Sequence, residues 1–312
     1  MEKLRPWDLD LYQLTYPVTP DELTPFETEA ELVSRGAAIF HQIDPALGAY
    51  FDDMRLHNLI DFSNRKGKGP GAFCASLEAR HKPFIFGNAV GQSRDVTTLL
   101  HECGHAFHGY ERYALPYTHL RNSPMEFNEV ASTAMEFLGA PYLTRDNGGF
   151  YTEADAARAR VKHLEKTILF WPYMAVVDAF QHWVYANHEA ATDPANCDAA
   201  WAEQWERFVP FIDWSGWEHT RTRGWHRKQH IHRAPFYYVE YGLAALGAVQ
   251  IWANARHDQP GAVQAYRRAL ALGDTVPLPA LYAAAGAKFA FDAETLGDAV
   301  SLIETVITEL EP

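Results

Sequence analysis

Residues 97–113 read TTLLHECGHAFHGYERY and place His101, Glu102, His105 and His108 within two helical turns. His101 and His105 are four residues apart, so on a helix they project from one face, where their imidazole nitrogens can bind one metal ion. Glu102 lies about 100° around the helix axis from His101, where a carboxylate can accept a proton from water that the metal activates. The alternative is a metal-free helix that is rich in histidine. The stretch favours a zinc site with its catalytic base.

A catalytic zinc site takes three protein ligands and keeps a fourth position for water, so one more ligand is expected. His108 is near in sequence, but at 1.5 Å per residue it stands about 10 Å along the helix axis from His101. That distance is too long for a shared ion, and His108 is expected to pack near the site or support a ligand. The longer H-E-x-x-H-x-x-G-x-x-H pattern, which supplies a third histidine, is absent. A carboxylate from a second helix is therefore expected.

Residues 123–137, SPMEFNEVASTAMEF, carry candidates for that carboxylate. Glu126, Glu129 and Glu136 recur at helical spacing on one face. Glu129 lies in the middle of the predicted helix and is predicted to be the third ligand. Glu136, two turns further on, is predicted to orient a metal-binding histidine. A surface helix also carries glutamates on one face, and this is the alternative.

Two other residues of the histidine-rich helix are predicted to have structural roles. Cys103 lies about 200° around the helix from His101, so it faces away from the metal and is expected to be a small core thiol. Gly104 has no side chain and is expected to let a neighbouring backbone approach closely. Neither residue is expected to take part in the chemistry.

The rest of the chain is predicted to be mainly helical. Thr24 is the predicted N-cap of a first helix with Pro25 in its first turn, and Ser123 is a second predicted N-cap. A long helical pattern covers residues 153–187, in which Pro172 is expected to kink or break the helix. Further helices are expected within residues 197–208, 237–252, 262–272 and 294–310.

Two short segments differ from the helical pattern. GAFCASLE, residues 71–78, and KPFIFGN, residues 82–88, are aromatic and β-branched segments bounded by glycine and proline, which predicts a strand pair. They lie directly before the histidine-rich helix, and the glycine-rich RKGKGPG segment ahead of them is a predicted loop. No change of composition marks a linker. The predicted fold is therefore one mainly α, zincin-type catalytic domain over residues 1–312, with a small antiparallel edge sheet beside the H-E-x-x-H helix.

Composition limits the partners and the compartment. The formal net charge is -13, and no run of Lys and Arg is long enough to follow a phosphate backbone, which argues against nucleic acid and anionic membranes. Three widely spaced cysteines indicate free thiols in a reducing compartment. The N-terminal MEKLRPWDLDLYQL has no apolar core for a signal peptide, and no later segment is long enough to span a bilayer. A cytoplasmic location is expected.

Taken together, these motifs resemble a known family. HECGHAFH, followed 24 residues after His105 by Glu129 in NEVAST, resembles the catalytic core of the thimet oligopeptidase and oligoendopeptidase F family of zinc metallopeptidases. KGKGPGAFC and PFIFGNAVGQS resemble its substrate-flanking loop and strand. AFQHWVY and QHIHRAPFYYVEYGLAALGAVQIW resemble the Pz-peptidase-like branch. The resemblance runs from about Leu32 to the end of the chain and corresponds to the catalytic C-terminal half of the family.

The resemblance implies a zinc-dependent endopeptidase that hydrolyses short peptides and holds one zinc ion per chain. His101, His105 and Glu129 match the family's zinc ligands, and Glu102 matches its general base. No other cofactor is implied.

His230 and Tyr237, in HIHRAPFYY, match the histidine and tyrosine that stabilise the tetrahedral intermediate in the family. The chemistry is consistent, because attack on a peptide carbonyl creates an oxyanion that needs hydrogen-bond donors besides the metal. Tyr241, one turn beyond Tyr237, is a weaker candidate for a second donor. Tyr238 is expected to be a core aromatic residue. The role of His232 is left open, because the branch usually carries an aromatic residue there.

The strand PFIFGNAV, residues 83–90, is expected to present an exposed edge. An extended peptide can pair its backbone with such an edge, which holds the scissile bond in register whatever the side chains are. An exposed edge without such a role is an aggregation hazard.

The chain also departs from the family pattern. Full-length members carry a helical N-terminal lobe, which is expected to be absent here, so the restriction to short peptides is not assumed. One alternative is a zinc-bound but inactive peptide-binding fragment, and another is a metal-free helical structural protein. Homo-oligomers are possible over surface that the lobe covers in other members.

Overall fold

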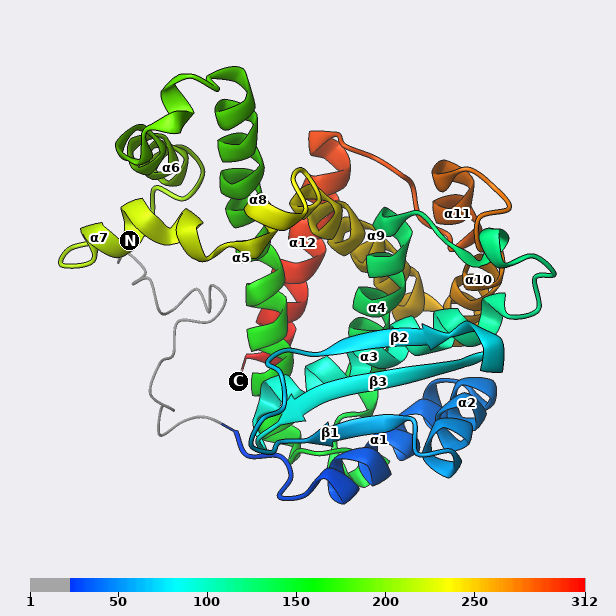
Figure 1. Ribbon diagram of the computed structural model, residues 1–312. Helices are drawn as coiled ribbons and strands as arrows, with labels where there is room; N and C mark the ends of the chain where they lie inside the picture. Colours follow the sequence, from blue (N-terminus) through cyan, green and yellow to red (C-terminus); the bar gives the residue numbers. More distant parts are fainter. Residues whose placement is uncertain (1–22, 312) are drawn as a thin grey trace. The chain divides into compact units, whose positions relative to one another are not determined.

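The structure is a computed structural model that describes residues 23–311 (Figure 1). The predicted mainly α fold with a small sheet is confirmed. The N-terminal stretch, on which the expectation about a signal peptide rests, lies outside the described residues. The strands are β1 (Ile60–Ser63), β2 (Phe73–Leu77) and β3 (Lys82–Ala89). The α-helices are α1 (Glu29–Ile43), α2 (Pro45–Leu56), α3 (Ser93–Arg112), α4 (Met125–Gly139), α5 (Glu153–Ala186), α6 (Pro194–Phe208), α7 (Glu218–Arg223), α8 (Gln229–Arg233), α9 (Tyr238–His257), α10 (Gln259–Ala271), α11 (Leu278–Ala284) and α12 (Ala293–Leu310).

The described chain divides into two compact units. The smaller unit contains Lys162–Gly242, and the larger unit contains the described parts of Pro20–Val161 together with Leu243–Pro312. Helices α5 and α9 contribute residues to both units. That the whole chain acts as one catalytic domain stays a prediction. None of the helices formed by the described residues is both long and apolar enough to cross a bilayer.

The larger unit is built around α3, which packs against α4 and against strands β2 and β3 (Figure 1). A capping box between Gln92 and Asp95 starts α3. Its apolar side chains at helical spacing are buried, and Phe107 meets Phe40 of α1 edge to face at 5.0 Å between ring centroids. Each such buried side chain stabilises the fold by about 1.5–3 kcal/mol. The helix that carries the histidines is therefore a fixed part of the core.

The sheet differs from the predicted strand pair. Strands β2 and β3 pair antiparallel as expected, but β1 pairs parallel with the other side of β3, giving the order β1-β3-β2. The expectation that residues 83–90 present an exposed edge is therefore wrong, because β3 is the central strand. Both β2 and β3 contact α3, but within the described sheet β2 pairs only with β3, so β2 is the one of the two with an unpaired edge.

Two predicted helix boundaries are wrong for identifiable reasons. Helix α1 begins at Glu29 and its N-cap is Thr28, whose side chain accepts a hydrogen bond from the Glu31 amide, so Thr24 is not the cap. Helix α4 has no side-chain cap, because the Ser123 hydroxyl pairs with His108 instead. Of the two outcomes expected at Pro172, a break does not occur, because α5 continues through this residue.

The smaller unit has its own aromatic core. Trp201 and Trp205 of α6 pack with Phe180 and Tyr173 of α5 and with Tyr238 at the start of α9. Phe180 meets Trp201 edge to face at 5.2 Å between ring centroids. Tyr238 is 2% exposed, which confirms that it is a core residue. Ile231 of α8 and Tyr241 of α9 pack against this core, which therefore supports residues 230–241, where the predicted oxyanion donors lie.

We expect Asp61 in β1 to stabilise the protein at neutral pH and not in acid. Hydrogen bonds and charge from Arg65 and Lys68 hold the pKa of Asp61 well below its ordinary value of 3.8. A carboxylate with a lowered pKa stabilises the fold above that ordinary value, and this contribution is lost as the pH falls further. Asp61→Asn should therefore lower Tm by about 2–4 °C at pH 7, for a loss of about 1 kcal/mol. Thermal melts at pH 7 and pH 3 check this, and an equal deficit at both values would contradict it.

Candidate metal centre

Helices α3 and α4 pack unusually closely where the predicted metal ligands lie. A Cβ atom added to Gly104 would lie 2.5 Å from the Ala131 carbonyl oxygen and 2.6 Å from the Ser132 Cα. Only glycine permits this approach, and the predicted role of Gly104 is confirmed. The contact brings the backbone of α4, two residues after Glu129, against the helical turn between His101 and His105.

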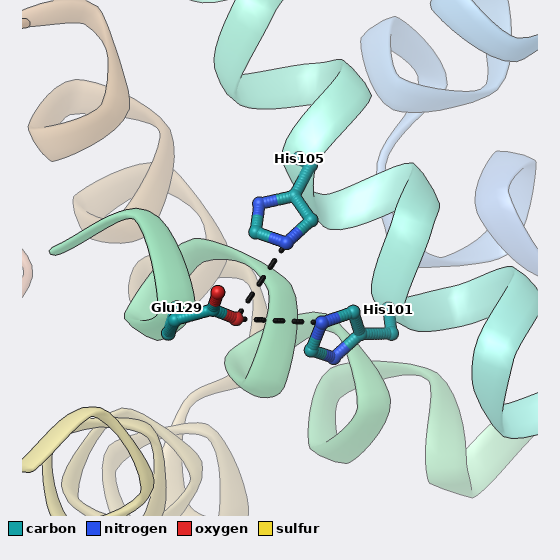
Figure 2. Close-up of side chains that lie close together, drawn as sticks. All are labelled: His101, His105 and Glu129. Atoms are coloured by element: carbon teal, nitrogen blue, oxygen red, sulfur yellow. Dashed lines mark ion pairs between the residues drawn. The ribbon is translucent and has the colours of Figure 1, made fainter. Parts of the chain in front are cut away.

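His101, His105 and Glu129 form one group in the structure (Figure 2). Each offers one ligand atom, and these atoms all lie within 4.8 Å of one another. Nε2 of His101 is 3.4 Å from Oε2 of Glu129, and Nε2 of His105 is 3.6 Å from the same oxygen. Two imidazole nitrogens and one carboxylate oxygen are a donor set that suits zinc and leaves room for a further ligand. The residues present therefore fit such an ion.

Two further side chains orient the group. Nδ1 of His101 is 2.7 Å from Oε1 of Glu136, which directs the opposite ring nitrogen, Nε2, toward Glu129. The Ser132 hydroxyl donates to Oε2 of Glu129 at 3.1 Å. The predicted contact between Glu136 and a histidine is present, and a carboxylate in this place fixes the tautomer of a metal-binding imidazole.

The electrostatics of His105 and Glu129 match the needs of metal ligands; for His101, burial lowers the pKa, but hydrogen bonds and charge from Glu129 and Glu136 outweigh burial and raise it well above the ordinary value. Burial lowers the pKa of His105 to about 4, so this imidazole is neutral and its nitrogen lone pair is available. Burial acts to raise the pKa of Glu129, but the hydrogen bond and charge of His101, together with the hydrogen bond from Ser132, oppose it, and the pKa is lowered to about 2. Glu129 is therefore ionised, as a carboxylate ligand must be.

Glu102 follows His101 on α3 and is 6% exposed. Burial is the main reason that its pKa is raised to about 7, and the nearby Glu129 carboxylate adds to the shift. Oε2 of Glu102 has no hydrogen-bond partner among the described residues. A buried carboxylate with a free acceptor atom suits a group that exchanges a proton with a bound molecule.

The other residues of the histidine-rich stretch have structural surroundings. His108 is 2% exposed, its Nε2 is 2.9 Å from the Ser123 hydroxyl, and its ring packs edge to face on Phe127. Cys103 is fully buried, as predicted. His108 is therefore a packing residue that links α3 to the start of α4.

His230, Tyr237 and Tyr241 lie together in the smaller unit. The His230 ring centroid is 6.1 Å from that of Tyr237 and 5.6 Å from that of Tyr241. The Tyr241 hydroxyl is 3.5 Å from Nε2 of His230. The structure thus brings the three predicted oxyanion donors into one cluster, whereas the metal ligands and Glu102 belong to the larger unit.

Two residues near this cluster, His232 and Lys228, have surroundings that no sequence motif indicates. His232, whose role was left open, is exposed, and its Nε2 is 3.2 Å from the Trp225 carbonyl oxygen. Lys228 is 8% exposed and donates to the Tyr238 hydroxyl at 2.7 Å. Burial lowers the pKa of Lys228 to about 7. No sequence pattern marks Lys228, because its burial depends on the tertiary packing of the aromatic core.

Comparisons with known proteins identify the family of the chain. The model of Peptidase family M3 matches residues 1–298 of the chain. An oligoendopeptidase F homolog from Borreliella burgdorferi is 24% identical over 225 residues, which are 71% of this chain and 37% of that protein. The solved structure of PZ peptidase A with an inhibitor superposes with a TM-score of 0.83 and 31% identity, over 91% of this chain and 50% of that one. The chain spans half or less of the length of these relatives, and it belongs to peptidase family M3.

Proposed function

We propose that the chain is a zinc-dependent endopeptidase that hydrolyses peptides, with His101, His105 and Glu129 as the zinc ligands. The observation that carries the proposal is the meeting of these three ligand atoms within 4.8 Å beside the buried Glu102, in a member of a peptidase family. One zinc ion per chain is the only cofactor. Zinc in this site supplies a Lewis acid that lowers the pKa of water and polarises a carbonyl group.

Glu102 is the proposed general base and acid. Its Oε2 accepts the proton that water loses as it attacks the scissile carbonyl carbon, and the same atom then gives the proton to the leaving amine. His230 and Tyr237 are the proposed donors to the oxyanion, and Tyr241 is a further donor. Imidazole N–H and phenol O–H groups serve this purpose because each can donate to negative charge that develops on oxygen.

The peptide substrate is proposed to bind along β2. This strand pairs only with β3 in the described sheet, so its other edge offers backbone donors and acceptors. An extended peptide can add there as a further strand, which gives affinity through main-chain hydrogen bonds with little dependence on side chains. β2 also lies near the base: burial is the main reason that the pKa of the Cys74 thiol in this strand is raised, and the charge of Glu102 raises it further.

The proposal is tested with an internally quenched peptide of about ten residues and the purified, zinc-loaded chain. Turnover that a chelator abolishes and added zinc restores is the expected result. A folded chain that holds one zinc ion and binds the peptide without cleaving it would instead support an inactive peptide-binding fragment. A folded chain that holds no zinc would overturn the metal site itself.

Replacing Glu136 with Ala should weaken zinc binding about 10–100-fold, because the carboxylate that orients His101 through Nδ1 is lost. Competition with a chromogenic chelator measures the affinity. Glu126→Ala is the matched control, since it removes a glutamate from the same helix one turn before Glu129 and should leave the affinity unchanged. Equal zinc affinity in the two variants would show that Glu136 does not support the metal site.

A further inference from the structure

Lys68 lies in the glycine-rich loop 64–72 that joins β1 to β2, and its side chain is only 2% exposed. Its Nζ lies 2.9 Å from the carbonyl oxygens of Asp61 and Ser63 and from Oδ1 of Asp61, and it also donates to the Gly87 carbonyl. These carbonyls belong to β1 and β3, whose register shifts between Asp61 and Ser63. The ammonium group therefore provides hydrogen bonds to carbonyls at the irregularity between the two strands.

A second contact ties the same loop to β3. Nδ2 of Asn88 donates to the carbonyl oxygens of Gly69 at 2.8 Å and Gly71 at 3.0 Å. The loop gains little from packing at its glycines, because a Cβ atom on Gly67, Gly69 or Gly71 would meet nothing within 4 Å. Side-chain contacts from Lys68 and Asn88 thus hold a backbone segment that is otherwise open.

Lys68 is linked to Phe73, the first residue of β2, through the ring of Phe86. Its Nζ lies 4.4 Å from the centroid of the Phe86 ring, a cation–π contact. Phe86 in turn stacks on Phe73 with 4.9 Å between ring centroids and an interplanar angle of 14°. Phe73 begins β2 and is directly opposite Phe86 in the register. The lysine, the central strand and the start of the edge strand therefore form one continuous contact.

We propose that Lys68 is a positioning residue for the peptide substrate: it holds the loop and the start of β2 so that the free edge of β2 can receive an extended peptide. The inference rests on the proposed function, because it concerns the substrate of that same site. Several backbone hydrogen bonds must form at once along an added strand, so an edge that is already ordered binds more tightly. Lys68 acts on binding and does not touch the reacting atoms.

The test compares Lys68→Met with Lys66→Met. Lys66 is two residues earlier in the same loop, is exposed and forms no ion pair with the residues that the structure describes. In the zinc-loaded chain, Lys68→Met should raise KM for a ten-residue quenched peptide about tenfold and change kcat less than threefold, whereas Lys66→Met should change both less than twofold. A Lys68 variant that lowers kcat with KM unchanged, or that matches Lys66→Met, would overturn the proposal.

Two further measurements keep the inference testable by itself. Amide hydrogen exchange of residues 64–77 should be faster in Lys68→Met than in Lys66→Met. Equal exchange rates would show that Lys68 does not hold the loop and the start of β2, and this result can be obtained even if the chain cleaves no peptide. Absence of turnover in the unmodified chain would instead count against the proposed function. If Lys68→Met does not fold, Asn88→Ala removes the second contact of the loop and should raise KM in the same way, and an unchanged KM overturns the proposal.

Discussion

Glu102→Gln is expected to keep one zinc ion bound and to lower kcat about 10²–10⁴-fold, the range that a positioned general base contributes. Glutamine has the shape of glutamate, so the packing around this 6% exposed side chain is preserved. It cannot accept a proton, so the step in which water attacks the carbonyl loses its base. Glu102 is not among the three proposed ligands, and the metal should therefore stay.

Zinc content per chain and steady-state kinetics on the same protein batch separate the possible explanations. His105→Ala is the informative comparison, because it should lose the metal and the activity together, while Glu102→Gln should lose activity alone. A Glu102→Gln chain that cleaves the peptide at the original rate would remove Glu102 from the mechanism. Loss of zinc from this variant would mean that the carboxylate supports the metal site and is not simply a base.

The grouping of the metal-site side chains was predictable because it depends on helical spacing. His101 and His105 are related by a single helical turn, and any α-helix over these residues places them on one face. Glu129 and Glu136 are two turns apart on α4, so both reach the same side of the neighbouring helix. The absence of a side chain at Gly104 indicated that another backbone comes close, and the structure identifies that backbone as α4.

Features that depend on non-local pairing or on competing partners could not be predicted in this way. Strand β1 has only four residues and becomes a strand because β3 lies beside it, so its segment carries no pattern of its own. Ser123 has the sequence context of an N-cap, but a buried histidine from α3 takes its hydroxyl. Lys68 has no sequence feature that separates it from other lysines of a polar loop, and its burial depends on carbonyl groups of β1 and β3 that come together only in the folded sheet.

Gly104→Ala is expected to destabilise the protein and to weaken the metal site at once. The added methyl group would lie within 2.6 Å of two backbone atoms of α4, which cannot rotate away as a side chain can. Retreat of α4 is opposed from another direction, because the buried Tyr266 hydroxyl donates to the same Ala131 carbonyl at 2.7 Å. We expect a loss of about 1–3 kcal/mol from overpacking and a fall in Tm of several degrees.

The direction of the change in stability distinguishes the two possibilities. Intrinsic helix propensity alone favours alanine over glycine by about 1 kcal/mol and would raise Tm, whereas the close contact at Gly104 should lower it. Gly297→Ala in α12 is the control, because a Cβ atom there meets nothing within 4 Å, and this variant should raise Tm slightly. Zinc affinity should fall more than tenfold in Gly104→Ala, since Glu129 is on the helix that must move, and should be unchanged in Gly297→Ala. Stabilisation of both variants would mean that the interface between α3 and α4 can accommodate a methyl group at position 104. The spacing of His101, His105 and Glu129 would then not depend on the close contact at Gly104.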